Sequence, residues 1–267
     1  MKKLDMPLTK VNEVYDGPEG KLWELIMGEQ IHAGGFQSSM DLARRADIAP
    51  GMKVLDLCSA LGAGVRFLVR NFDVEGFGLD GTRTMHEEAL RRAKEDGLDG
   101  KTEFKFGDVT DIPWPDGTFD AVWGEDAWCY VIDKAQLVRE ARRVLKPGGI
   151  IAFTDWIEGA KGLSDEEAER INRFMKFPYM ESLEGYRDLL GRTGFDVQEA
   201  SDHTEGFANL IDLYMRMLGE QLTGDALRII GHDMEMFQAM AGEMKFLSDC
   251  AHAGKFGRGR FIAKRTP

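Results

Sequence analysis

Short apolar segments with strand character recur along the first half of the chain and alternate with helical patterns. The predicted strands are residues 54–57, 76–80, 104–106, 121–123 and 150–153. A helical pattern covers residues 84–94, and Pro147 with Gly148 ends the helix before the fifth strand. Parallel strands need crossover helices of this kind, so residues 52–155 are predicted to form an α/β domain with a parallel sheet.

The pattern changes after residue 155. Ser164 and Glu167 have the spacing of a capping box, in which each side chain accepts a hydrogen bond from the other residue's backbone, and they predict the start of an amphipathic helix. Two further strands are predicted at 195–197 and 259–264, with a long helical stretch between them. A connection of that length inside a compact domain indicates a cap over a site.

This order of elements divides the chain into three parts. We predict an N-terminal helical lid segment over residues 1–50, a core over residues 51–206 and 251–267, and a helical cap insertion over residues 207–250. No repeat, low-complexity tract or Pro-rich linker separates them, so they are expected to form one folding unit.

Composition and charge narrow the classes of function. The chain of 267 residues has 46 acidic and 34 basic side chains, a formal net charge of −12, which argues against a nucleic-acid partner. The sequence contains no apolar run long enough to cross a membrane, and its first residues lack the apolar stretch of a signal peptide, so a cytoplasmic protein without a membrane partner is expected. The three cysteines, Cys58, Cys129 and Cys250, lack metal-binding spacing, and no metal site is predicted.

A loop of small residues joins the first predicted strand to the helix after it. Residues 56–64 read Asp-Leu-Cys-Ser-Ala-Leu-Gly-Ala-Gly, and small side chains let backbone amides approach a ligand at the start of a helix. Asp80 ends the second strand, where a carboxylate can accept both ribose hydroxyls of an adenosine ligand. A plain tight turn with a solvated Asp80 would explain the same residues.

Three further segments extend this pattern. They are Gly107-Asp108-Val109, residues 111–120 (Asp-Ile-Pro-Trp-Pro-Asp-Gly-Thr-Phe-Asp) and residues 143–149 (Arg-Val-Leu-Lys-Pro-Gly-Gly). With them, residues 52–155 resemble the class I S-adenosylmethionine-dependent methyltransferases. The resemblance implies a Rossmann-like sheet, mostly parallel with an antiparallel last strand, and S-adenosylmethionine as a cofactor that becomes S-adenosylhomocysteine. That family usually shows D-x-G-x-G-x-G in the loop, whereas Cys58 and Ala60 replace the first two glycines here.

A narrower resemblance covers most of the chain. Residues 27–34, 67–70, 125–128, 180–187 and 253–255 are similar to the glycine/sarcosine/dimethylglycine N-methyltransferases. This resemblance implies methyl transfer to a small amine of that series. Cys129 and Tyr130 stand where Leu-His is common in that family, and this departure leaves open a small-molecule O-, S- or C-methyltransferase. Cys58 and Ala60, which replace glycines in the loop, leave open a cofactor-binding protein without turnover.

The class I resemblance also assigns the cofactor-binding residues. It places the methionine part of the cofactor at the small-residue loop, the ribose at the end of the second strand and the adenine after the third strand. The residues expected to bind the cofactor are Asp56, Cys58, Ser59, Ala60, Gly62, Asp80, Gly81, Asp108, Val109, Glu125 and Asp126.

A second set of residues is expected to act on the acceptor. Methyl transfer needs an oriented and deprotonated nucleophile in a water-poor pocket, and His32, Glu125, Trp128 and Tyr130 are the catalytic candidates. Aromatic rings can hold a methylated ammonium, and an arginine fork can hold a carboxylate. The predicted acceptor-binding residues are Trp23, His32, Tyr130, Tyr179, Arg187 and Arg260.

Simpler roles compete for several of these residues. His32 would also suit a structural hydrogen bond, Trp128 core packing, and the two arginines surface ion pairs. The sequence leaves a homodimer open.

Overall fold

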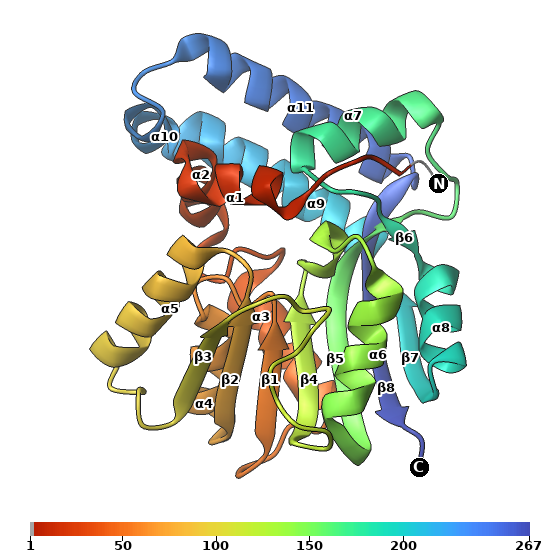
Figure 1. Cartoon of the computed structure of the whole chain (residues 1–267). Helices are drawn as coiled ribbons and strands as arrows, with labels where there is room; N and C mark the ends of the chain where they lie inside the picture. The colour runs from red at the N-terminus through yellow and green to blue at the C-terminus, as the bar shows by residue number, and fades with distance from the viewer. Residues whose placement is uncertain (1–2) are drawn as a thin grey trace.

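The computed structural model describes residues 3–267 and has a mixed β-sheet at its centre (Figure 1). The strand order is β3-β2-β1-β4-β5-β8-β7, and the short β6 pairs with the end of β5. Strands β1 to β5 run parallel to one another, while β8 runs antiparallel to both β5 and β7. The strands are β1 (Lys53–Leu57), β2 (Glu75–Asp80), β3 (Thr102–Phe106), β4 (Phe119–Glu125), β5 (Leu145–Glu158), β6 (Glu181–Ser182), β7 (Phe195–Asp202) and β8 (Phe256–Arg265). The predicted mostly parallel sheet with an antiparallel last strand is confirmed.

Helices cover both faces of this sheet. The helices α6 (Lys134–Val144) and α8 (Leu183–Arg192) pack on one face. On the other face lie α3 (Gly35–Arg45), α4 (Ala63–Phe72) and α5 (Arg83–Glu95). Strands buried between two helical layers need apolar residues on both sides, which explains the nearly continuous apolar runs of the central strands.

The N-terminal helices divide into two groups. The helices α1 (Leu8–Asp16) and α2 (Pro18–Met27) lie beyond the carboxyl ends of the parallel strands (Figure 1). In contrast, α3 packs against the sheet through Leu42 and Ala43, which are buried in one core cluster with strand residues. The predicted lid boundary at residue 50 therefore differs from the structure, because α3 belongs with the sheet.

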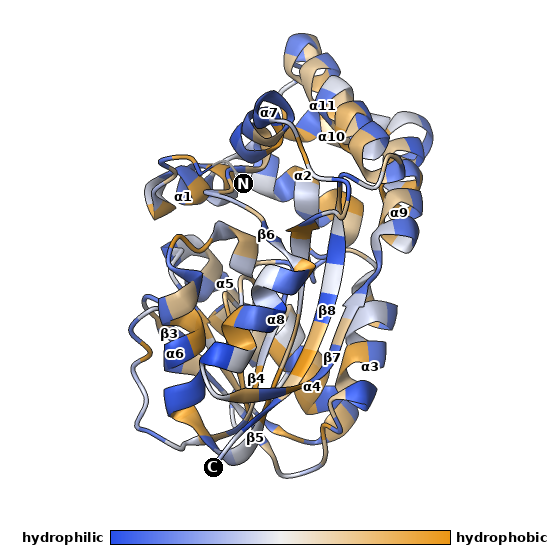
Figure 2. Cartoon of the chain, turned by 90° about the vertical axis from the view of Figure 1, so that its right-hand side faces the viewer, coloured by the Kyte–Doolittle hydropathy of each residue, from blue (hydrophilic) through white to orange (hydrophobic). Residues whose placement is uncertain are grey.

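Five further helical segments lie above the sheet beside α1 and α2. They are α7 (Asp165–Met175), α9 (Thr204–Arg216), the π-helical turn η2 (Met217–Gln221), α10 (Thr223–Ile229) and α11 (Met234–His252). The capping box predicted at Ser164 and Glu167 begins α7. These helices carry apolar and polar residues side by side, as amphipathic helices do (Figure 2). Their apolar faces form two core clusters with α1 and α2.

The cap packs on α2 of the lid through η2, α10 and α11. Met240 of α11 is buried in one cluster with Leu22 and Ile26 of α2. Within residues 3–267, no helix is long and apolar enough to cross a membrane.

Candidate active site

The loop between β1 and α4 wraps around the end of β2. The backbone N–H groups of Cys58 and Ser59 both donate to the carbonyl of Leu79, over 2.9 and 3.1 Å. Cys58 and Ala60 have φ angles of 63° and 43°, and Gly62 has 66°. Positive φ is costly for residues with a Cβ, so the loop keeps the backbone shape that glycine favours although two of its positions lack glycine.

Asp80 closes this loop from the end of β2. Its Oδ2 accepts a hydrogen bond from the Ala60 N–H over 2.8 Å, and its Oδ1 accepts one from the Thr82 N–H over 2.7 Å. Burial raises the pKa of Asp80, and these two backbone donors counteract that rise. Each carboxylate oxygen has two lone pairs, so Asp80 can still accept hydrogen bonds from a ligand.

Asp56 lies beside the start of α4, and its carboxylate explains why position 64 is a glycine. A Cβ at position 64 would lie 2.7 Å from Asp56 Oδ2, so only glycine lets the helix begin this close to the carboxylate. Asp56 is buried, and its pKa is raised well above the ordinary value, first by desolvation and then by the nearby charges of Glu125 and Asp80. A cation bound here would offset that repulsion.

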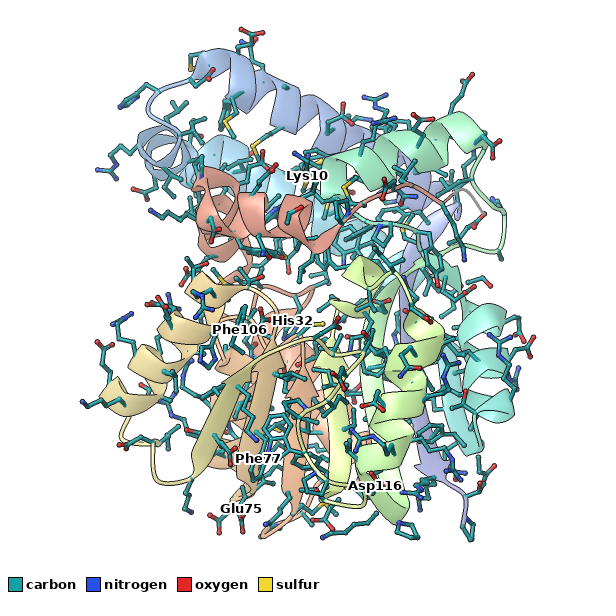
Figure 3. All side chains as sticks on the ribbon, viewed as in Figure 1. Lys10, His32, Glu75, Phe77, Phe106 and Asp116 are labelled. Carbon is teal, nitrogen blue, oxygen red and sulfur yellow. The ribbon has the colours of Figure 1, made fainter. Side chains whose placement is uncertain are left out.

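A cavity lies above these residues and is closed from the other side by α1 and the α2–α3 loop. His32, labelled in Figure 3, marks its position beyond the carboxyl ends of the strands. From the lid side, the cavity is lined by Leu8, Val11 and Tyr15 of α1 and by residues 29–32. From the sheet side, it is lined by Asp56, residues 58–61, Ala63, Gly64, residues 80–82, Met85, Trp123, residues 125–127 and Tyr130. Four of these residues are carboxylates near the ends of β1, β2 and β4, namely Asp56, Asp80, Glu125 and Asp126. The cavity is therefore suited to a positively charged ligand.

Glu125 forms a buried hydrogen-bonded group with Ser39 of α3 and His32 of the α2–α3 loop. The Ser39 hydroxyl donates to Glu125 Oε2 over 2.8 Å, and His32 Nε2 lies 3.0 Å from that hydroxyl and 3.3 Å from the same carboxylate oxygen. Desolvation raises the pKa of Glu125, while the charges of His32 and Arg258 oppose that rise. The arrangement can accept a proton at the imidazole and share it with the carboxylate.

Asp126 ties three parts of the molecule together. Its Oδ1 accepts a hydrogen bond from Arg258 Nε over 2.7 Å, and its Oδ2 accepts one from the Ala33 N–H over 2.9 Å. The same guanidinium donates to Ser38 and Thr154, over 2.9 Å in each case. These bonds hold the α2–α3 loop against β4, β5 and β8, so this wall of the cavity is fixed.

A smaller chamber adjoins the cavity and shares part of its wall. Both are lined by Tyr15, Ile31, His32, Asp126 and Tyr130. The remaining walls of the chamber are Trp23 and Met27 of α2, Trp156 of β5, Met175 of α7 and Phe177. The chamber is therefore largely aromatic and apolar, and its described lining contains neither arginine nor lysine.

Two tyrosines meet at the boundary between the cavity and the chamber. The hydroxyls of Tyr15 on α1 and Tyr130 on the turn η1 (Trp128–Tyr130) lie 3.2 Å apart. Burial raises the pKa of both phenols above the ordinary value, so neither is poised to act as a base near neutral pH. Their contact links the lid to the end of β4.

Most of the predicted site residues lie in these two spaces. His32, Asp56, Cys58, Ser59, Ala60, Asp80, Gly81, Glu125, Asp126 and Tyr130 line the cavity. Trp23, His32 and Tyr130 line the chamber. Gly62 lies in the loop but not in the lining, because it faces Phe104 and Ala89, which a Cβ would approach within 2.6 and 2.9 Å.

Two predicted adenine contacts lie outside the described lining. Asp108 is exposed, and its Oδ1 accepts hydrogen bonds from the backbone N–H and the hydroxyl of Thr110, each over 2.8 Å. Val109 is buried in the core of the α6 face. Both residues follow β3, beside the wall that Gly81 and Thr82 form.

Four other predictions are corrected by the structure. Trp128 is fully buried and stacks on Phe153, with ring centroids 4.1 Å apart, so it packs the core. The ring of Tyr179 covers the ammonium of Lys134 at 3.7 Å instead of facing the chamber. Arg187 is exposed on α8 and pairs with Glu184, and Arg260 pairs with Asp41 and Glu199. Neither arginine lines the cavity or the chamber.

The sequence patterns missed several residues of the site. Tyr15, Met175 and Phe177 line the chamber from outside the segments that carry the resemblance, and Met27 begins one of those segments but was not predicted as a site residue. Their aromatic or apolar character was the only signal, and core residues share it.

Two buried polar atoms test whether S-adenosylmethionine fits the cavity. Among the described residues, Trp123 Nε1 and Glu125 Oε1 have no hydrogen-bond partner, although both residues line the cavity. One atom can donate and the other can accept, and leaving buried polar atoms unpaired is costly. The methionine part of the cofactor carries a carboxylate and an ammonium, so its charges match these two atoms, while its sulfonium matches the acidic wall. The residues present fit the cofactor.

Residues 55–153 match the family model described as a methyltransferase domain. The chain therefore carries a class I S-adenosylmethionine-dependent methyltransferase domain, as the sequence resemblance predicted. Members of this family use S-adenosylmethionine as methyl donor, and solved structural neighbours hold S-adenosylmethionine or S-adenosylhomocysteine.

Relatives along most of the chain are named as N-methyltransferases. Phosphoethanolamine N-methyltransferase 3 of Arabidopsis thaliana is 30% identical over 251 residues, which cover 91% of this chain and 49% of that protein. Sarcosine/dimethylglycine N-methyltransferase of Halorhodospira halochloris is 27% identical over 218 residues, which cover 75% of this chain and 77% of that protein. The chain thus spans about half the length of the plant relative.

The fold has close counterparts among solved structures. Phosphoethanolamine N-methyltransferase 2 of Haemonchus contortus, in complex with S-adenosyl-L-methionine, superposes with a TM-score of 0.86 at 19% identity. The superposition covers 96% of this chain and 59% of that chain. At this identity, the likeness establishes the fold.

Proposed function

We propose that the protein transfers the methyl group of S-adenosylmethionine to a small amine whose body is apolar and carries no anionic group. The observation that carries the proposal is the shared wall of the two spaces. An acid-lined cavity that fits the cofactor adjoins an aromatic chamber, and Tyr15, Ile31, His32, Asp126 and Tyr130 line both. An acceptor in the chamber would therefore reach the cofactor at that wall.

The cofactor supplies an activated methyl group, and the protein supplies its position. Asp80 is proposed to accept the ribose hydroxyls, while Asp56, Trp123 and Glu125 are proposed to hold the methionine part. Holding two reactants in an attack geometry can contribute on the order of 7–11 kcal/mol to such a reaction. Little covalent help from side chains is then required.

The chamber supports an amine acceptor through its aromatic walls. Trp23, Trp156, Tyr15 and Tyr130 line it, and a methylated ammonium over the face of such a ring gains roughly 0.5–2 kcal/mol. The nearby carboxylates of Glu125 and Asp126 add attraction for a cation. The curated relatives are also named for N-methylation.

The same chamber argues against the anionic acceptors of those relatives. Sarcosine carries a carboxylate and phosphoethanolamine a phosphate, and either group would need a cationic partner once buried. Arg187 and Arg260, the expected partners, lie elsewhere. We therefore propose an amine with an apolar or aromatic body in place of the glycine series.

His32 is proposed to take up the proton that the amine loses. Its imidazole lines both spaces and lies next to Ser39 and Glu125, which can share the proton. The fixed α2–α3 loop, held by Asp126, keeps the imidazole in place. We also propose that the acceptor is a small molecule and that the protein acts in the cytoplasm.

A methyl-transfer assay with labelled S-adenosylmethionine tests it. Phenethylamine and its N-methyl derivatives serve as apolar amines, and glycine, sarcosine, dimethylglycine and phosphoethanolamine serve as anionic amines. We expect incorporation into the first group and little into the second. Incorporation confined to the anionic group would reject the proposed acceptor class, and cofactor binding without turnover on either group or on phenol, thiol and carbanion acceptors would reject the enzymatic proposal.

A further inference from the structure

A groove lined by arginines runs along α6 and reaches the end of the sheet away from the cavity. Arg139, Arg142 and Arg143 of α6, Arg192 of α8 and Arg265 of β8 line it together with Asp116. Figure 3 labels Asp116 at the foot of α6 and His32 at the opposite end of the strands. The groove is therefore separate from the candidate active site.

Four of these five arginines differ from most others in the described chain because they lack carboxylate partners. Arg143 pairs with Glu140 and Asp116, but none of the other four lies within ion-pair distance of a described carboxylate. Elsewhere within residues 3–267, only Arg44, Arg83 and Arg216 share that property, and they do not line a common groove. In a protein of net charge −12, unpaired guanidiniums gathered in one place are unexpected.

Neighbouring groups accept only a few hydrogen bonds from Arg139, Arg142 and Arg265, so some of their N–H groups are free to bind a ligand. Arg142 reaches the carbonyls of Gly194 and Thr266 over 3.4 Å each, and Arg265 donates to the Leu145 carbonyl. These contacts fix the two side chains in place. Even so, Arg265 Nε is buried without a hydrogen-bond partner. Arg139 has only the Gln136 amide oxygen, at 2.9 Å, as a hydrogen-bond partner among the described residues.

The negative C-terminal ends of two helices offset only part of the positive charge of the groove. The groove runs along α6 from Ala135 to Arg143 and reaches the C-terminal ends of α6 and α8, and each helix end carries roughly half a negative charge. Together with the acidic partners of Arg143, these ends leave a surplus of about two positive charges. Arginines at a helix end therefore do not explain the whole cluster.

We propose that this groove binds a small molecule carrying two or more phosphate groups. Guanidinium forks match phosphate oxygens in two parallel hydrogen bonds, and the four unpaired arginines come from three different elements, so they surround a ligand from several sides. Arg142 and Arg265 provide fixed donors, and the exposed Arg139 and Arg192 complete the contact from the rim. Nothing in this proposal depends on the identity of the methyl acceptor.

Titration calorimetry with inorganic tripolyphosphate at low salt tests the site. The variant Arg139→Ala/Arg192→Ala removes two exposed side chains that hold no backbone group, so the fold is expected to persist. The control Arg173→Ala/Arg228→Ala removes two other exposed arginines, from α7 and α10, and changes the net charge by the same amount. Saturating S-adenosylhomocysteine is present throughout to occupy the cavity.

We expect one tripolyphosphate per chain, an affinity at least about tenfold lower in the groove variant, and little change in the control. Adenosine triphosphate, titrated in parallel, reveals whether the ligand's organic part also binds, since only then would it bind more tightly than tripolyphosphate. The proposal fails if tripolyphosphate does not bind, or if both double variants weaken binding equally. It also fails if only an acidic polypeptide such as polyglutamate binds, because the groove would then be a protein-docking surface.

Discussion

The two halves of the candidate active site are built in opposite ways. The cofactor half consists of short contiguous segments, mainly the β1–α4 loop and residues 80–82, and its polar groups are carboxylates and backbone amides. The acceptor half is assembled from α1, α2, η1, β5 and α7, and its surface is mostly aromatic. A charged ligand common to a family can be held by local backbone geometry, whereas acceptor choice depends on how distant elements pack.

The largest expected effect comes from breaking the cofactor half at Asp80. In Asp80→Ala, two charge-assisted hydrogen bonds to the ribose would be lost, each worth about 1.5–3 kcal/mol, so affinity for S-adenosylhomocysteine should fall roughly a hundredfold or more. Calorimetry measures this loss. At saturating cofactor, the KM for the acceptor should change little, because the acceptor half is untouched.

Two further variants keep that result interpretable. Asp80→Asn retains the side-chain shape and one accepting oxygen, so an intermediate loss is expected. Asp99→Ala removes an exposed carboxylate from the loop before β3 and should leave the affinity unchanged. Unchanged affinity in Asp80→Ala would remove Asp80 from the cofactor site.

The comparison also explains which parts of the structure the sequence predicts. The loop and Asp80 are recognisable because their chemistry is local: small residues, a helix start and a strand-end acid. Cys58 and Ala60 depart from the expected glycines, yet both have positive φ, so backbone hydrogen bonds to Leu79 and Asp80 maintain the loop despite the side chains. The parallel arrangement of the first five strands is predicted for the same local reason, because strands alternate with helices along the chain.

The acceptor half was predicted poorly because its residues are brought together by tertiary packing. Tyr15 reaches the cavity only because α1 lies across the end of the sheet, where Asn12 accepts a hydrogen bond from the Thr82 hydroxyl over 2.9 Å. Trp128 follows β4 as expected, but the turn η1 directs it onto Phe153. For Arg187, a local signal existed, since Glu184 stands three residues earlier on the same helix.

An effect of intermediate size, on the free energy of unfolding, is expected from substitution of Asp155, a core residue that supports the acceptor half. This carboxylate accepts hydrogen bonds from the Cys129 N–H over 3.0 Å and from the Tyr186 hydroxyl over 2.5 Å, so it positions the turn that carries Tyr130. Burial raises its pKa to about 6. The folded state therefore holds this proton more tightly than the unfolded state does.

The sign of the pH dependence follows from that difference. The stabilisation from protonated Asp155 is complete below about pH 4, is lost as the pH rises to about 6, and amounts to roughly 3 kcal/mol. Asp155→Asn should therefore show a smaller fall in the free energy of unfolding between pH 4 and pH 6 than the wild-type protein, as measured by urea denaturation. Equal slopes in both proteins would mean that Asp155 titrates normally.

Cofactor addition separates the two halves in the same experiment. Asp56 and Glu125 face the cavity, so a bound cation should lower their raised pKa values and change the wild-type slope. The difference between the wild-type protein and Asp155→Asn should stay the same, because Asp155 lines neither space.

The smallest effect is expected where the two halves meet, at the hydroxyls of Tyr15 and Tyr130. A hydrogen bond between neutral groups is worth about 0.5–1.5 kcal/mol, so Tyr15→Phe and Tyr130→Phe should each lower kcat/KM for the acceptor roughly threefold to tenfold. Affinity for S-adenosylhomocysteine should be retained. Because the two hydroxyls contact each other, removing both should cost little more than removing one. Fully additive losses would show that the hydroxyls act separately, and a shifted pH profile of kcat in either variant would contradict the raised pKa values, which exclude both phenols as bases near neutral pH.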